Sequence, residues 1–161
     1  KNVQGLDGNS VDPSIKGAHV HAWGAGATID LGDSGLNIDG DFIQTRGNRD
    51  LGHANLWTAG LNYGKVDLNK PGSFTLGVHY VRADAGAYLL GNSALDMTDQ
   101  LEYGWDNGTG VKFWVAKAGV AVQKNVELDA YYNFGAKAFD RYDDSTKDPA
   151  NTWGVELNYA F

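Results

Sequence analysis

The chain has 161 residues, a formal net charge of −7 and a mean hydropathy of −0.38. This length suits one domain and is sufficient to bury a core. The acidic balance argues against a nucleic-acid partner, and the absence of cysteine removes thiol catalysis, disulfides and cysteine-based metal sites. The polar opening residues hold no apolar stretch of a signal peptide, so either one was cleaved or the chain starts partway into a longer one.

The composition suits a membrane barrel better than a soluble domain. Glycine is abundant, with 22 residues, and aromatic residues make up 12% of the chain. No stretch approaches 18 consecutive apolar residues, which excludes a transmembrane helix and leaves a β-barrel as the only spanning option. Barrel strands alternate apolar and polar residues, so their mean hydropathy stays low.

Seven segments alternate with a period of two and are enriched in β-branched and aromatic residues, and helical periodicity competes nowhere over a comparable length. They predict strands over residues 15–30, 34–46, 56–66, 73–82, 110–123, 126–135 and 153–161. The first is the least regular. Residues 84–105 are ambiguous, and a strand there would make eight.

The connections alternate in length along the chain. Short ones at 31–34, 66–72 and 123–125 alternate with longer ones at 46–55, 83–109 and 136–150. Short periplasmic turns and longer extracellular loops are typical of outer-membrane barrels.

The alternation separates a polar face from an apolar one. The polar face would form a mixed-charge wall that selects permeants by electrostatics. Its candidate pore-lining residues are Asn37, Asp39, Asp41, Asn62, His79, Lys117, Glu127, Asp129, Asn133, Glu156 and Asn158. Aromatic residues gather near strand ends on the other face, as in the girdles that meet lipid at the two membrane interfaces. The candidate girdle residues are Trp57, Tyr63, Phe74, Tyr80, Trp114, Tyr132, Phe134, Trp153, Tyr159 and Phe161.

Three segments together resemble bacterial outer-membrane porins. They are the tail W-G-V-E-L-N-Y-A-F, the hairpin G-V-A-V-Q-K-N-V-E-L-D-A-Y-Y-N-F and the acidic loop between them. The hairpin and loop look most like the C-terminal barrel region of the putative porins of diderm Firmicutes (Negativicutes), which carry S-layer-homology domains. The resemblance implies that barrel-assembly machinery reads the final strand. It implies peptidoglycan binding only through a domain that these residues do not contain.

Other constellations have simpler interpretations. His19 and His21 could share a metal but lack a third ligand, so we interpret them as polar lumen residues. Asp39 and Asp41 are better explained as lumen-facing acids than as a catalytic dyad. The charged residues of the last loop predict a solvated surface, with divalent-cation binding near lipopolysaccharide as a second interpretation: Asp140, Arg141, Asp143, Asp144, Lys147 and Asp148. No nucleophile elbow or phosphate-binding loop is present, so we expect no enzyme, cofactor or metal.

We therefore expect an all-β, antiparallel transmembrane barrel of meander topology in a bacterial outer membrane. It would be a porin for passive diffusion of small hydrophilic solutes, in contact with outer-membrane lipid and lipopolysaccharide, with a homo-trimer as the assembly considered. The alternatives are a small filled barrel with a structural or adhesive role and a soluble all-β binding module. Strand parity places residues 1–14 in an extracellular loop or extension and makes residues 15–161 the C-terminal strands of a larger barrel, the alternative being a complete eight-stranded barrel.

Overall fold

The computed structural model describes residues 20–47, 53–87, 98–140 and 145–160. In these residues, seven strands form one antiparallel sheet in chain order, each hydrogen-bonded to the next along the sequence. All seven predicted strands are confirmed: β1 (Val20–Asp30), β2 (Leu36–Gly47), β3 (His53–Gly64), β4 (Phe74–Ala83), β5 (Gly110–Gln123), β6 (Val126–Phe139) and β7 (Thr152–Tyr159). Residues 1–14, expected to be an external loop or extension, and residues 15–19 of the first predicted strand lie outside the described part.

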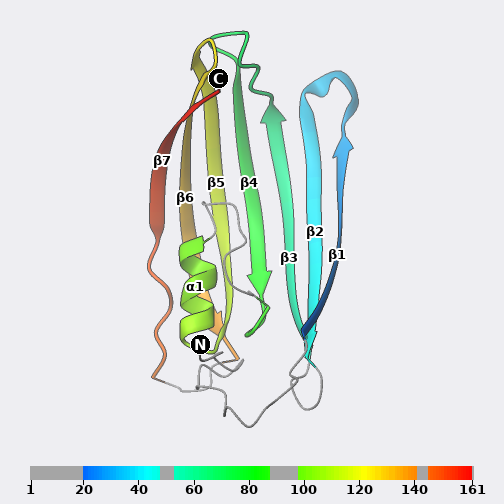
Figure 1. The fold of residues 1–161 in the computed structure, drawn as a ribbon, viewed down its shortest axis with the longest axis vertical. Coiled ribbons are helices and arrows are strands. Elements are labelled where there is room, and N and C mark those ends of the chain that lie inside the picture. Colours follow the sequence, from blue (N-terminus) through cyan, green and yellow to red (C-terminus); the bar gives the residue numbers. More distant parts are fainter. Residues whose placement is uncertain (1–19, 48–52, 88–97, 141–144, 161) are drawn as a thin grey trace.

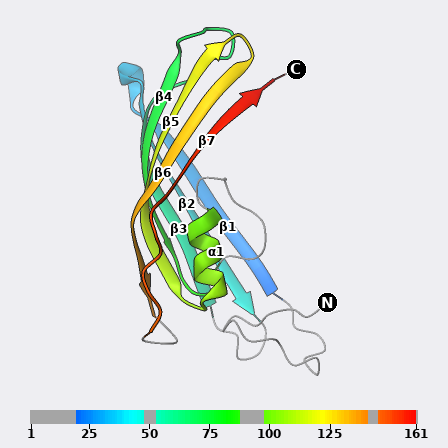
Figure 2. The same cartoon turned by 90° about the vertical axis from the view of Figure 1, so that its left-hand side faces the viewer.

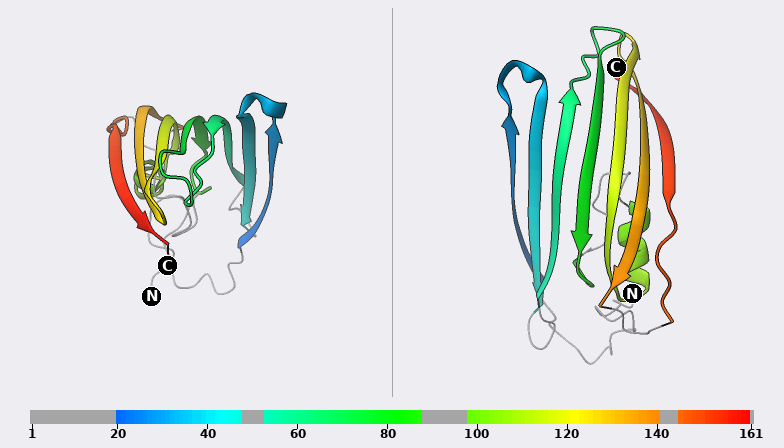
Figure 3. Two further views of the ribbon diagram at one scale, coloured as in Figure 1. Left: turned by 90° about the horizontal axis from the view of Figure 1, so that it is seen from above. Right: turned by 180° about the vertical axis from the view of Figure 1, so that it is seen from behind.

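The sheet curves into a trough that is open between β1 and β7 (Figure 3, left). We call the concave side the inner face and the convex side the outer face. The alternative of a complete eight-stranded barrel is wrong for the described residues, because the sheet has seven strands and its two edges do not pair.

The connections β1–β2, β3–β4 and β5–β6 lie at one end of the sheet, the turn end, and the other three lie at the opposite end, the loop end (Figure 1). The β5–β6 turn places Asn125 at φ 63°, a left-handed conformation that asparagine tolerates better than most residues. A 3-10 turn over Gly32–Ser34 links β1 to β2 and ends at Gly35, also left-handed at φ 71°. The predicted alternation of short and long connections holds from β4 onward but is wrong before it, because the strand bounds leave only residues 48–52 between β2 and β3 and the longer segment 65–73 between β3 and β4.

Strand β6 runs four residues beyond its predicted end at Gly135. Gly135 has φ 63° and lies where the β5–β6 register shifts between Lys112 and Trp114. A glycine in this conformation is typical of a β-bulge, which interrupts pairing without ending the strand. Glycine in the sequence thus indicated a loop where the chain only bends.

A helix, α1 (Thr98–Asp106), occupies the last part of the segment 84–105 that the sequence left ambiguous, and residues 88–97 of that segment lie outside the described residues. It packs on the inner face against β5 and β6 near the loop end (Figure 2). Its Leu101 joins a buried cluster with Val81, Phe113 and Val115 of the sheet. The idea of an eighth strand over residues 98–105 is therefore wrong. Buried positions 100, 101 and 104 of the helix follow a helical spacing, but glutamine at 100 and glycine at 104 hid the apolar pattern.

Candidate functional site

The eleven polar residues proposed to line a pore all share the inner face. Directly paired residues of antiparallel strands point to the same side of a sheet. The register pairs Asn37 with Asn62 and Asp129 with Glu156, and it joins Asp39 to His79 through Gly60. The same pairing pattern assigns the remaining members to this face: Asp41, Lys117, Glu127, Asn133 and Asn158.

Four of these side chains form a hydrogen-bonded cluster, which we call the His79 cluster. Asn62 Nδ2 donates to Asn37 Oδ1 at 2.9 Å and to Asp39 Oδ1 at 2.6 Å. The Asn62 Oδ1 atom lies 2.9 Å from His79 Nε2, and because a carbonyl oxygen only accepts, Nε2 is the donor. His79 Nδ1 lies 3.5 Å from Asp39 Oδ2. The sequence left His79 without a partner, since the residues that bind it are 17 and 40 positions away.

Glycine on neighbouring strands makes room for this cluster. A Cβ atom on Gly60 would lie only 2.5 Å from His79 Cε1 and 2.7 Å from Asp39 Oδ1. The side chains therefore extend along the wall, over the glycine, and project less into the concavity. Other inner-face glycines receive a neighbouring side chain in the same way: Gly26, Gly77, Gly119 and Gly154.

Replacing Gly60 with alanine is expected to destabilise the fold by about 1–3 kcal/mol, the usual cost of forcing an atom into an occupied site. The free energy of unfolding measures this loss. His79→Ala removes the ring that the new Cβ would meet, so the cost of Gly60→Ala should fall markedly in that background. Equal costs in both backgrounds would contradict the close approach of His79 to Gly60.

A second group of acids lies at the turn end of the inner face, on β6 and β7. Asp129 pairs with Glu156, and Glu127 pairs with Asn158. Asn158 Nδ2 donates to Asp129 Oδ2 at 2.8 Å. Within the described ranges, no group of three or more His, Asp or Glu side chains is arranged to hold a metal ion. The arrangement is therefore an acidic surface and not a coordination site.

Charge is sorted between the two faces. All six acidic residues of the described strands lie on the inner face: Asp30, Asp39, Asp41, Glu127, Asp129 and Glu156. Of the five lysines and arginines in these strands, Lys117 alone shares that face. The inner face is therefore strongly acidic.

Asn133 differs from the other pore-lining candidates because it is fully buried. Its Nδ2 donates to Thr152 Oγ1 at 3.1 Å, and Thr152 Oγ1 in turn lies 3.4 Å from Gln100 Oε1 of α1. The helix thus covers Asn133, and exposure to a pore is wrong for this residue as the structure stands. Sequence alternation gives the face of a residue but not what lies over it.

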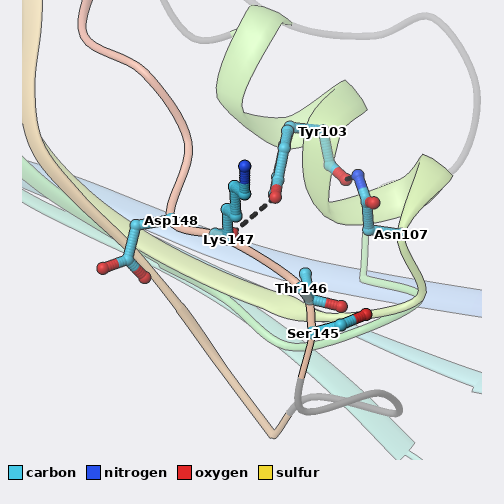
Figure 4. Close-up of a pocket in the computed structure, with 6 residues that line it drawn as sticks. All are labelled: Tyr103, Asn107, Ser145, Thr146, Lys147 and Asp148. Atoms are coloured by element: carbon cyan, nitrogen blue, oxygen red, sulfur yellow. Dashed lines mark hydrogen bonds between the residues drawn. The ribbon is translucent and has the colours of Figure 1, made fainter.

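The loop before β7 holds α1 from its other side. Tyr103 Oη donates to the Lys147 carbonyl oxygen, and Gln100 Nε2 donates to the Ala150 carbonyl oxygen at 2.8 Å. Between helix and loop lies a polar hollow of about 600 Å³ (Figure 4), lined by Tyr103, Asn107, Ser145, Thr146, Lys147 and Asp148. Asp148 is exposed, as expected of a solvated loop acid, and its Oδ1 also accepts from the Ala138 backbone N–H of β6 at 3.0 Å. The helix is therefore fixed between the sheet and this loop.

The outer face is apolar and exposed. Leu76 is 50% exposed, Leu157 68% and Trp153 73%. The register places on this face all candidate girdle residues except Phe161, which lies outside the described residues: Trp57, Tyr63, Phe74, Tyr80, Trp114, Tyr132, Phe134, Trp153 and Tyr159. Such a continuous apolar surface marks an interaction site with lipid or protein.

His21 is on the opposite face from the one expected. It pairs with Arg46, two positions along β1 from Trp23, and so belongs to the outer face. The irregular alternation of the first segment, with alanine on both faces and two glycines on the inner one, hid this assignment. His19 lies outside the described residues.

The aromatic residues of the outer face form two belts. The loop-end belt includes ring contacts between Trp57 and Tyr80 at 5.3 Å and between Tyr80 and Trp114 at 5.0 Å. The turn-end belt includes Tyr63 and Phe74, whose ring centroids are 6.1 Å apart. Between the belts, the outer positions of the described strands hold only alanine, glycine, valine, leucine and isoleucine.

Comparison with known protein families found no matching family model, and comparison with curated proteins found no significant match. No helix in the described part of the chain is long and apolar enough to cross a membrane.

Proposed function

We propose that this sheet is part of the wall of an outer-membrane β-barrel that acts as a diffusion channel for small hydrophilic solutes. One observation carries the proposal: a fully apolar band between two aromatic belts covers the outer face, while every acid of the described strands lies on the inner face. This is the distribution that lipid on one side and water on the other would require. A soluble module would instead leave a large apolar surface exposed to water.

The spacing of the belts sets the height of the apolar band. Trp57 and Tyr63 are six residues apart, as are Phe74 and Tyr80. The strand rise of about 3.3 Å per residue separates the two belts by about 20 Å along each strand. For strands tilted by about 35° this is about 16 Å along the bilayer normal, so the apolar band of this sheet is shorter than the height of about 25 Å that is typical of such barrels.

The belts also predict the tilt of the strands. The loop-end belt passes from Trp57 on β3 to Trp153 on β7, which is four strand steps. Over these steps the belt moves four residues toward the turn end, relative to the row of residues that pair directly across the strands. The turn-end belt shifts equally between Tyr63 and Tyr159. A shift of one residue per strand moves the belt about 3.3 Å along the strand axis for each inter-strand spacing of about 4.8 Å. The belts would therefore lie parallel to the membrane plane if the strands tilt by about 35° from the membrane normal. Barrels need a tilt of this size in order to close.

Strand direction limits how the barrel can close. Strands β1 and β7 run in the same direction, because an even number of antiparallel steps separates them. If β1 and β7 paired directly, they would form a parallel pair. The same holds if β7 paired with β1 of a second copy that is rotated about the barrel axis. Closure with antiparallel pairs only therefore needs an odd number of further strands, which supports a barrel larger than this sheet.

Helix α1 would narrow the lumen near the loop end. It covers the apolar part of the inner face and leaves the His79 cluster and the acids of β6 and β7 uncovered. A structural or adhesive barrel would have a filled interior throughout. The uncovered polar half favours a water-filled channel.

Conductance in planar lipid bilayers tests the proposal. The protein, purified in its closed assembly, is expected to form open pores that pass cations more readily than anions, since carboxylates outnumber Lys117 on the inner face. Neutralising Asp39, Asp41 and Asp129 to asparagine should move the reversal potential in a salt gradient toward that of an unselective pore. Absence of conductance from folded, inserted protein would contradict the channel.

A further inference from the structure

The outer face carries a row of basic residues just beyond the loop-end aromatic belt. Each strand from β1 to β6 contributes one, and together we call them the basic band: His21, Arg46, His53, Arg82, Lys112 and Lys137. His21, Arg46 and His53 form one row of directly paired residues, and Arg82, Lys112 and Lys137 form a second row about four residues nearer the turn end. The band therefore follows the aromatic belt over six strands, two to four residues away from it.

Members of the band lie directly beside one another. Arg82 pairs with Lys112, and Lys112 pairs with Lys137, so three cationic side chains are adjacent across β4, β5 and β6. Like charges at directly opposed positions, with Cβ atoms about 5 Å apart, destabilise a sheet. Such an arrangement is favourable when an anion binds between them.

The described residues supply little counter-charge. Arg82 Nε lies 3.9 Å from Asp84 Oδ1, and its guanidinium stacks 4.4 Å from the centroid of the Phe139 ring. Neither Lys112 nor Lys137 has a carboxylate within ion-pair distance in the described ranges. The acids of the strands all lie on the inner face, so the sheet separates them from the band.

The place of the band selects the anion. Trp and Tyr prefer the level of the lipid headgroups at a membrane surface. On each strand from β1 to β6, the basic residue lies two to four residues beyond an aromatic residue of the loop-end belt, on the side away from the apolar surface. Arginine and lysine at that level would meet lipid phosphates, which accept charge-assisted hydrogen bonds from both.

We propose that the basic band binds phosphate groups of anionic lipid headgroups in the leaflet at the loop end. This inference rests on the proposed membrane function and adds a lipid specificity to it. A phosphate placed between Arg82, Lys112 and Lys137 would offset their mutual repulsion. The aromatic belt beside them would hold the acyl side of the same lipid.

The test compares the stability of the folded protein in vesicles of phosphatidylcholine alone and with added phosphatidic acid. The test variant is Arg82→Gln/Lys112→Gln/Lys137→Gln. The matched control, Lys65→Gln/Lys70→Gln/Lys124→Gln, removes three positive charges at the turn end. Phosphatidic acid should stabilise the wild type and the control variant. In the test variant, the increase in the folding equilibrium constant that phosphatidic acid causes should be smaller by about fivefold for each band charge removed.

Further arms identify the anion. Inorganic phosphate added to phosphatidylcholine vesicles should not reproduce the stabilisation, and vesicles with a carboxylate lipid should give less of it. If free phosphate or the carboxylate lipid works as well as phosphatidic acid, the lipid-phosphate inference is overturned. An equal response of both triple variants also overturns it. Failure of the wild type to insert into phosphatidylcholine alone would instead contradict the membrane function.

Discussion

Replacing Ala130 with lysine is expected to lower the free energy of unfolding in lipid vesicles by about 2–4 kcal/mol, the cost of a charge on the lipid face of a barrel near the bilayer midplane. Ala130 lies on β6 between Ala118 and Val155, midway between the two aromatic belts of the outer face. A lysine there would have to leave its charge in hydrocarbon or bend it to a distant headgroup. Urea titration of the vesicle-bound protein measures the loss.

An inward-facing residue of the same strand provides the control. Glu127 lies three residues before Ala130 and points to the inner face, beside the other acids. Glu127→Lys replaces one of several like charges with its opposite in a polar setting, so we expect little loss of stability. Similar losses for both variants would contradict the assignment of the two faces.

The strands could be predicted because one physical pattern determines them. Apolar and polar residues alternate regularly along Trp153–Tyr159, and only a β-strand places such alternating residues on two separate faces. The same pattern assigned each pore-lining candidate to the correct face. Errors came at residues that carry no apolar pattern: Gly135 suggested an end to β6, and Gln100 and Gly104 concealed the buried side of α1.

The His79 cluster and the basic band could not be predicted because both depend on strand register. His79 meets Asp39 only because β2, β3 and β4 align Asp39, Gly60 and His79 in one row. The band likewise becomes visible when His21, Arg46 and His53 are found side by side. Period-two alternation gives the side of each residue, whereas pairing across strands needs the position of every turn.

Replacing Phe113 with alanine is expected to release helix α1 from the wall and to raise the single-channel conductance. Phe113 is fully buried on the inner face of β5, in one apolar cluster with Leu101 of the helix. Loss of such a side chain costs about 3–5 kcal/mol. The substitution leaves the strand ladder and the lipid-facing surface unchanged, so the loss falls on the packing between helix and sheet. Amide exchange of residues 98–106 would show the helix loosening, and planar-bilayer recording would show the wider pore.

Trp114→Leu is the matched control for this effect. Trp114 is the next residue on β5 but lies on the outer face, 43% exposed and in ring contact with Tyr80. Leucine keeps that surface apolar, so the helix should stay docked and the conductance should stay at the wild-type value. If Phe113→Ala inserts, loses protection in residues 98–106 and still conducts as the wild type does, then α1 does not narrow the channel. In that case the constriction would have to come from the polar half of the inner face, where the His79 cluster and the acids of β6 and β7 lie.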